Sequence, residues 1–330
     1  MFILDRILPF IIPVTRRVKG YIRFVQNYIR PFIKWFLHAF TRLSELQRIC
    51  YGARAGASRT SQVERSLILS KRPQIRRLVL DLDEAAPYVD NAELLKFAPR
   101  AARIVMQAKR IKNNVHPDFA RLFGTCVTSI WGYRRLMHQV EQLRAEKYDS
   151  DNLDHEQKLL RLWQLLMPEA PLTGRVSKQW QDIGFQGDDP KTDFRGMGML
   201  GLENLLYFAT AYNDAAKHVL LHSMHPTLGY TYAIVGINLT SMAFNLVKTG
   251  AAKTHFYNLV VQHRQDFSTV EDFHKLYCYL FFEFDRFWMD SDPRNIMDFR
   301  EIYQAFEITK LEALHNDSTI FKTNLVVESV

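Results

Sequence analysis

Residues 268–293 read STVEDFHKLYCYLFFEFDRFWMDSDP, and this stretch decides the fold class. Its large apolar side chains recur every three or four residues, a spacing that places them on one face of an α-helix. They are Phe273, Leu276, Tyr277, Leu280, Phe281, Phe284, Phe287 and Trp288. Ser268 and Glu271 stand at the separation of a capping box, and Pro293 follows the end. We therefore predict a long helix here.

Helical periods also mark other parts of the chain. One helix is predicted to open after Pro117 and to close before residues 148–150, and another, over 159–166, stops at Pro168. The segment TYAIVGINLT at 231–240 is rich in β-branched residues, which favours a strand. Its polar residues nevertheless repeat with a helical period: Asn238, Ser241, Asn245 and Lys248. We therefore predict a helix there as well.

Residues 71–117 have a mixed pattern, and we expect four prolines to break them into short helical segments. The four are Pro73, Pro87, Pro99 and Pro117. Few windows of the chain alternate apolar with polar residues, and glycine is sparse, at 14 of 330. The prediction is an all-α, multi-helix protein. The three cysteines are far apart and odd in number, which indicates reduced thiols rather than a disulfide framework: Cys50, Cys126 and Cys278.

Positive charge is concentrated at the N-terminus. Residues 1–43 hold eight Lys and Arg residues against Asp5 alone, which gives +7 of the chain's +8. The remaining residues are close to neutral, and this disfavours a nucleic-acid-binding core.

The same N-terminal segment is amphipathic. Its apolar face consists of Val18, Tyr21, Val25, Ile29, Phe32, Phe36, Phe40 and Leu43. Basic residues occupy largely another face, and Pro31 is expected to split or kink the helix. Such a composition is typical of a helix that lies in an anionic membrane interface. The alternative is a helix docked on the protein's own core. No uncharged apolar run is long enough for a spanning helix, and the features of a secretory signal or transit peptide are missing.

We divide the chain into four parts: a basic amphipathic membrane-association segment at 1–43, a helical region at 44–152, a domain at 153–310 and a tail at 311–330.

The domain at 153–310 contains residues 180–198, WQDIGFQGDDPKTDFRGMG. This loop has two turns, four carboxylates and one arginine but little hydrophobic periodicity. A loop of this kind is costly unless it has a function. We place the function at Arg195.

Several residues are expected to shape this loop around Arg195. They are Trp180, Gly184, Phe185, Gln186, Gly187, Asp188, Asp189, Pro190, Thr192, Asp193, Phe194, Gly196 and Gly198. The glycines permit backbone conformations that other residues avoid, and the proline fixes one backbone angle. Thr192 or Asp193 is placed to cap a helix that begins near Met197.

Two interpretations of Arg195 remain open from the residues alone. In the first, it forms an intramolecular ion pair with Asp188, Asp189 or Asp193, a common and modest interaction. In the second, the guanidinium is presented to an anionic partner, which the aspartates steer toward it. A helix start close by disfavours an uncompensated cation. Some partner must therefore compensate its charge.

Other motifs carry less weight. Residues 196–201 fit G-x-G-x-x-G but lack a buried strand before them, so glycines that allow close packing are the better interpretation. Lys191-Thr192 resembles the end of a P-loop, although Pro190 occupies the glycine position, and we predict no nucleotide cofactor. Adjacent Asp188 and Asp189 rarely converge on one reacting atom, which favours turn and ion-pair roles.

Three histidines share a helical spacing. His218, His222 and His225 lie at i, i+4 and i+7 and have the spacing for zinc ligands, but no glutamate follows His218 to act as a base, and Pro226 is close. A surface or partly packed histidine face is the simpler interpretation. We predict no metal.

Several segments resemble the ELMO-domain-containing (ELMOD) family over about residues 44–310. Besides residues 180–198, they are ELQRICYGARAGASRT at 45–60, YDSDNLDHE at 148–156, RVSKQW at 175–180, AIVGINLT at 233–240 and KTHFYN at 253–258. Residues 71–117 depart from the family's pattern. The resemblance implies an all-helical fold and GTPase-activating activity toward Arf and Arl GTPases. It also implies that Arg195, in DFRG, is the arginine that such activators use.

Together, resemblance and residues predict an activator that is not itself a hydrolase. It would bind an Arf- or Arl-type GTPase in its GTP-bound form and supply Arg195 in trans as an arginine finger to the phosphoryl group in transfer. Gln186 would either help to place the attacking water or be a structural amide. The basic N-terminal segment would hold a cytoplasmic protein peripherally on a membrane. The alternative is a non-catalytic adaptor or effector that binds a GTPase or another partner.

Overall fold

The computed structural model describes residues 30–326, which form α-helices and short 3-10 helices with no strand among them. The predicted all-α class is confirmed. The α-helices are α2 (Arg30–Thr41), α3 (Glu45–Gly52), α4 (Ala57–Ile68), α5 (Pro73–Ala85), α6 (Asn91–Lys109), α7 (Pro117–Ala145), α8 (Leu153–Leu166), α9 (Gly198–Ala211), α10 (Asn213–Ser223), α11 (Tyr232–Thr249), α12 (Lys253–Gln262), α13 (Val270–Asp290) and α14 (Phe299–Leu314).

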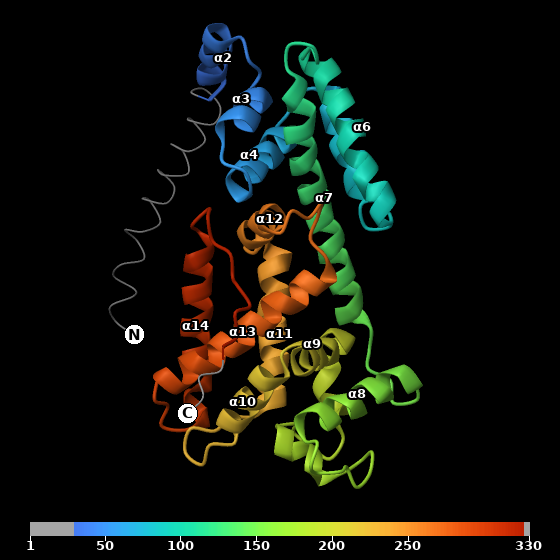
Figure 1. Ribbon diagram of the computed structural model, residues 1–330, viewed down its shortest axis with the longest axis vertical. Coiled ribbons are helices and arrows are strands. Elements are labelled where there is room, and N and C mark those ends of the chain that lie inside the picture. Colours follow the sequence, from blue (N-terminus) through green and yellow to red (C-terminus); the bar gives the residue numbers. More distant parts are fainter. Residues whose placement is uncertain (1–29, 327–330) are drawn as a thin grey trace, which may run out of the picture.

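The long helix α7 connects the two ends of an elongated molecule (Figure 1). It begins at Pro117, as predicted, and its 29 residues span roughly 43 Å. Its N-terminal part packs against α3, α4 and α6, and it also contacts α9, α11, α12 and α13. Figure 1 places α2 and α3 at one end of the long axis and the α8–α9 region near the other. The N-terminal helices and the loop that carries Arg195 are therefore far apart.

The predicted C-terminal helix is present as α13, with its start one residue later than expected. Thr269, not Ser268, is the N-cap, and Asp272 completes the capping box that the sequence suggested for Glu271. Both registers fit the same motif, but the extended backbone of Thr269 lets its hydroxyl accept from the Asp272 N–H. The apolar face of α13 packs against α9, α10, α11 and α14.

Proline breaks most of the segment at 71–117, but not all of it. Pro73 and Pro117 occupy the first turns of α5 and α7, where the missing N–H costs little. Pro99 instead lies inside α6, so the predicted break there is wrong. Five apolar residues of α6 are buried on either side of it, and this packing holds the helix together: Leu94, Phe97, Ala101, Ala102 and Val105.

The ambiguous segment at 231–240 is helical, as predicted, and forms the first half of α11. Most of α11 is buried, which explains its mixture of β-branched and apolar residues. Part of its polar stripe faces α14, where Asn238, Ser241 and Asn245 line a surface groove with Tyr303. The Tyr303 hydroxyl donates to the Asn238 carbonyl at 2.8 Å.

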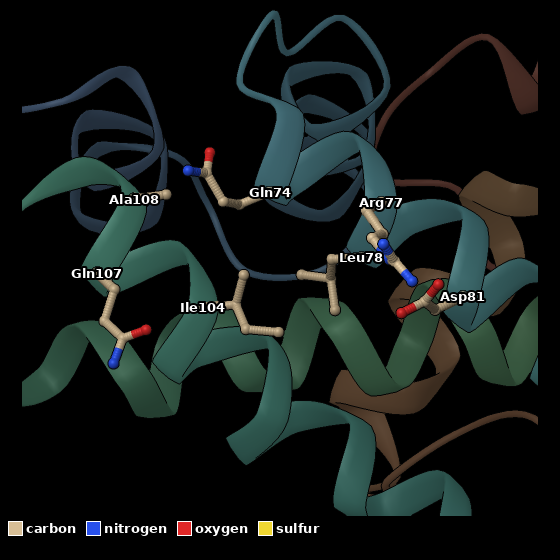
Figure 2. Close-up of a pocket in the computed structure, with 7 residues that line it drawn as sticks. All are labelled: Gln74, Arg77, Leu78, Asp81, Ile104, Gln107 and Ala108. Atoms are coloured by element: carbon tan, nitrogen blue, oxygen red, sulfur yellow. The ribbon is translucent and has the colours of Figure 1, made fainter.

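A second groove of about 430 Å³ lies between α5 and α6. Figure 2 shows Leu78 and Ile104 in its middle, with Arg77 and Asp81 at one end and Gln107 at the other. Its lining residues all belong to α5 and α6. This groove is thus separate from the loop that contains Arg195.

Helix α2 carries exposed aromatic side chains. Phe32, Trp35, Phe36 and Phe40 are each more than half exposed, so these four side chains are not packed on the core. The rest of the predicted amphipathic segment, including the helix expected before Pro31, falls in residues 1–29, outside the described residues. No helix among residues 30–326 is both long enough and apolar enough to span a bilayer.

Candidate functional site

Two 3-10 helices build the loop around Arg195. They are η2 (Lys178–Ile183) and η3 (Pro190–Arg195), between α8 and α9. Asp189 caps η3 by accepting the Lys191 N–H at 3.0 Å, and Pro190 takes the first position, where its fixed φ suits a helix start. Arg195 is the last residue of η3. The loop thus ends in a short, defined helix that carries the arginine.

Buried aromatic rings anchor this loop from beneath. Trp180, Phe185 and Phe194 are each at most 3% exposed. Trp180 and Phe185 meet edge to face at 5.8 Å, Phe185 and Phe194 at 5.7 Å, and Phe194 packs on Tyr148 at 5.4 Å. Edge-to-face pairs of this kind add about 0.5–1.5 kcal/mol each beyond area burial. Since Phe194 directly precedes Arg195, these contacts fix the backbone that presents it.

An ionic cluster braces the loop from the side. Arg175 donates through Nε to Glu156 and pairs through Nη1 with Asp189 at 2.9 Å. The Tyr148 hydroxyl also donates to Glu156. Burial, followed by the bond to Glu156, raises the pKa of Tyr148. These side chains join α8 and the 148–152 segment to the cap of η3.

The loop's carboxylates are bonded to groups other than Arg195. Asp188 accepts from the Gln181 amide at 3.0 Å, and Asp189 pairs with Arg175. Asp193 accepts the Gln186 backbone N–H at 2.9 Å. No ion pair joins Arg195 to any of these carboxylates, so the intramolecular bridge considered from the sequence is wrong. Asp189 has the expected ion-pair role, and Asp188 accepts a hydrogen bond within the turn.

Arg195 is exposed, and its only hydrogen bond to the described residues runs from Nε to the Thr192 carbonyl at 3.0 Å. That bond orients the side chain while both terminal nitrogens stay available. Burial raises the pKa of neighbouring Asp193, against the Gln186 N–H and the Arg195 charge, which lower it. The Gln186 side chain is exposed and makes no hydrogen bond within residues 30–326. The alternative of a structural amide therefore has no support there.

The predicted cap of the following helix is wrong. Met197 is the N-cap of α9, and no side chain caps it. Asp193 is engaged by Gln186, and Thr192 lies within η3. The first turn of α9 is instead tied to the end of α7, because the Met199 N–H donates to the Glu146 carbonyl at 2.8 Å.

Only two of the four loop glycines have a positive φ. Gly184 and Gly198 do, at 84° and 52°, and a Cβ on either would meet neighbouring backbone at once. A Cβ on Gly196 would meet nothing within 4 Å, and one on Gly187 would be unhindered. The conformational freedom expected of these glycines is thus used at Gly184 and Gly198 but not at Gly187 and Gly196. Close packing remains the correct interpretation of the G-x-G-x-x-G match, because Gly198 abuts the end of α7.

The histidine cluster departs from the predicted set. His218 and His222 lie on α10, partly buried, with ring centroids 4.0 Å apart. His222 Nδ1 lies 2.7 Å from Asp285 Oδ2 on α13. His225 is outside the helix and accepts from the Thr227 and Leu228 N–H groups in a turn.

Residues 138–303 match the model of the ELMO/CED-12 family. The chain is 46% identical over 283 residues to ELMO domain-containing protein 2 of Mus musculus, covering 86% of this chain and 91% of the relative. The chain belongs to the ELMO/CED-12 family. The human ELMO domain-containing protein 2 is 44% identical over 300 residues, which cover 91% of this chain and 96% of the relative. ELMO domain-containing protein 1 of Mus musculus is 42% identical over 311 residues, which cover 89% of this chain and 90% of the relative.

The ELMO/CED-12 match contains the whole of the braced loop and Arg195, together with α8 to α13. The sequence did not indicate the ionic brace that Glu156, Arg175 and Tyr148 form. These three lie in YDSDNLDHE and RVSKQW, two of the segments that carry the family resemblance. Their charge complementarity was visible, but a separation of about twenty residues concealed the contact.

Proposed function

We propose that this chain activates GTP hydrolysis by an Arf- or Arl-type GTPase through Arg195, acting as an arginine finger. One observation carries the proposal. The guanidinium is exposed on a braced 3-10 helix, while Asp188, Asp189 and Asp193 are each bonded to another group. An arginine that only stabilised the loop would use those carboxylates.

The chemistry matches what phosphoryl transfer needs from a partner. Charge accumulates on the transferring group, and an arginine supplied in trans is worth about 10³- to 10⁵-fold in rate. The two unbound terminal nitrogens of Arg195 have the planar fork that suits phosphate oxygens. Preorganisation by Phe194 and by the Thr192 carbonyl lowers the entropy cost of placing that fork. Gln186, exposed beside Asp193, is positioned to contact the same partner.

The exposed aromatics of α2 support a second part of the proposal, which is peripheral attachment to an anionic membrane. Phe32, Trp35, Phe36 and Phe40 form an apolar face, and the basic residues of 1–43 supply attraction to acidic lipids. Because α2 and the Arg195 loop lie at opposite ends of the molecule, α2 would concentrate the activator at the membrane rather than orient the loop directly.

Single-turnover GTP hydrolysis by purified Arf and Arl proteins tests this function. We expect the wild-type chain to accelerate at least one of them and Arg195→Ala to abolish the gain. An adaptor would bind the GTPase without changing the rate, and that result would reject the proposal.

A further inference from the structure

A second cluster, between α10 and α13, brings three metal-ligand side chains together. His218 and His222 of α10 and Asp285 of α13 each offer one donor atom, and these atoms lie within 4.8 Å of one another. The two histidines occupy positions i and i+4, so they share one face of α10. That face is directed at α13, which α10 contacts.

Asp285 is fully buried, and its surroundings are already arranged. Its Oδ2 lies 2.7 Å from His222 Nδ1, and its Oδ1 accepts the Tyr230 hydroxyl at 2.6 Å. A buried carboxylate is costly without a positive partner. Within residues 30–326, its only ion-pair partner is His222. The site therefore favours added positive charge.

His218 has no such partner. Its ring lies 4.0 Å from that of His222 and packs against Phe282, and its nitrogens make no hydrogen bond to the described residues. Two imidazole rings this close repel each other if both are positively charged, so only one of them is readily protonated. A divalent cation bound by both rings supplies the positive charge that Asp285 favours and uses the idle nitrogen of His218.

We propose that His218, His222 and Asp285 form a zinc site that clamps α10 to α13. Two imidazole nitrogens and one carboxylate oxygen are borderline donors that suit Zn²⁺. Bonds of about 2.0–2.2 Å at tetrahedral angles place donors roughly 3.3 Å apart, so side-chain adjustments of about 1.5 Å or less complete the site. Tyr230, bonded to the second carboxylate oxygen, orients Asp285 as an outer partner.

Solvent reaches this site from one side, because the His222 side chain is 30% exposed. A water molecule therefore supplies the fourth ligand. The inference departs from the sequence expectation of no metal, which considered His225 in place of Asp285. It does not depend on the role of Arg195.

Zinc binding by the full-length protein tests the inference. The protein is stripped with a chelator, dialysed and titrated with Zn²⁺ in competition with a chromophoric chelator, and bound metal is measured by mass spectrometry. We expect one Zn²⁺ per chain and a higher unfolding temperature with the metal. Co²⁺ in its place should give the visible absorption of a tetrahedral site.

His218→Gln is the informative variant because His218 makes no hydrogen bond to the described residues, so its loss leaves the His222–Asp285 pair intact. It should weaken zinc affinity at least about tenfold and remove the rise in unfolding temperature. His225→Gln, in the adjacent turn, is the matched control and should bind zinc as the wild type does. Equal binding by wild type and His218→Gln, or no zinc retained by the wild type, would overturn the inference.

Discussion

Asp189 pairs with Arg175 at 2.9 Å, and not with Arg195 six residues further on. Arg175 thereby joins the cap of η3 to Glu156 on α8, whereas Arg195, at the other end of η3, donates only to the Thr192 carbonyl among the described residues. Two arginines near one acidic loop thus have different roles. The first braces the loop, and we propose that the second contacts a partner.

Arg175→Ala should destabilise the protein and weaken GTPase activation while Arg195 is still present. The substitution leaves the Glu156 carboxylate, only 15% exposed, with the Tyr148 hydroxyl as its remaining partner. We expect a loss of about 1–3 kcal/mol in the free energy of unfolding, measured by urea denaturation. Arg161→Ala, at an exposed position on α8, is the control and should change stability little. Equal stability of the two variants would show that the brace is unimportant.

Gly198→Ala should be far more damaging than Gly196→Ala, two residues away. A Cβ at Gly198, where φ is 52°, would collide with the carbonyl oxygens of Arg144 and Glu146, which are backbone atoms and cannot rotate away. The same atom at Gly196 meets nothing within 4 Å. We expect a cost of about 2–4 kcal/mol at Gly198 and little change at Gly196, compared by thermal unfolding. Similar effects at both sites would contradict the close approach of α9 to the end of α7.

Acid should destabilise the fold through His255. Burial lowers the pKa of this ring to about 3, so it stays neutral in the folded protein, whereas the unfolded ring takes up a proton near its ordinary value of 6.5. The unfolded state then binds more protons, and stability falls as the pH drops from 6.5 toward 3.

His255→Asn removes this titration and keeps an acceptor for the Phe321 N–H that His255 Nδ1 now binds at 3.1 Å. Urea unfolding at about pH 7.5 and about pH 5 should show a smaller loss of stability on acidification in the variant than in the wild type. His315→Asn, at an exposed position, should keep the wild-type pH dependence. If His255→Asn lost as much stability on acidification as the wild type does, groups other than His255 would cause the loss.

Membrane attachment should depend on the aromatic face of α2. Trp35 and Phe40 are 65% and 83% exposed, and replacing both with glutamate removes apolar area and adds repulsion from acidic lipids. Flotation with anionic liposomes should show at least about tenfold weaker partitioning. Met297→Glu is the matched control, since Met297 is also 83% exposed but lies before α14. Undiminished flotation of the double variant would reject the role of α2.

Periodicity predicted the helices well because burial of one face dictates the spacing of apolar residues. α7, α11 and α13 are examples. It failed at Pro99, where packing of α6 outweighs one lost hydrogen bond, and at the start of α13, where two capping boxes overlap. The spacing of residues along the sequence does not show whether packing outweighs the lost hydrogen bond at Pro99, or which of the two capping boxes forms.

The residues of the loop could be recognised in the sequence, but their contacts could not. The loop's glycines, proline and Arg195 were recognisable from 180–198, whereas the partners of its carboxylates were not. Asp189 pairs with a residue fourteen positions earlier, and the Trp180–Phe185–Phe194 stack depends on the fold of η2 and η3. Asp285 is more than sixty residues from His222 in the sequence. It lies beside His218 and His222 because α10 packs against α13.

The most direct test of the central claim is single-turnover hydrolysis of GTP by an Arf or Arl protein that the wild-type chain activates. Arg195→Ala and Arg195→Lys should each lose nearly all of an acceleration of about 10³- to 10⁵-fold, because neither offers a planar fork. Their unfolding free energies should stay within about 0.5 kcal/mol of the wild type, since Arg195 bonds only the Thr192 carbonyl among the described residues, and Arg161→Ala should retain full activation. Full activation by Arg195→Ala would contradict the account.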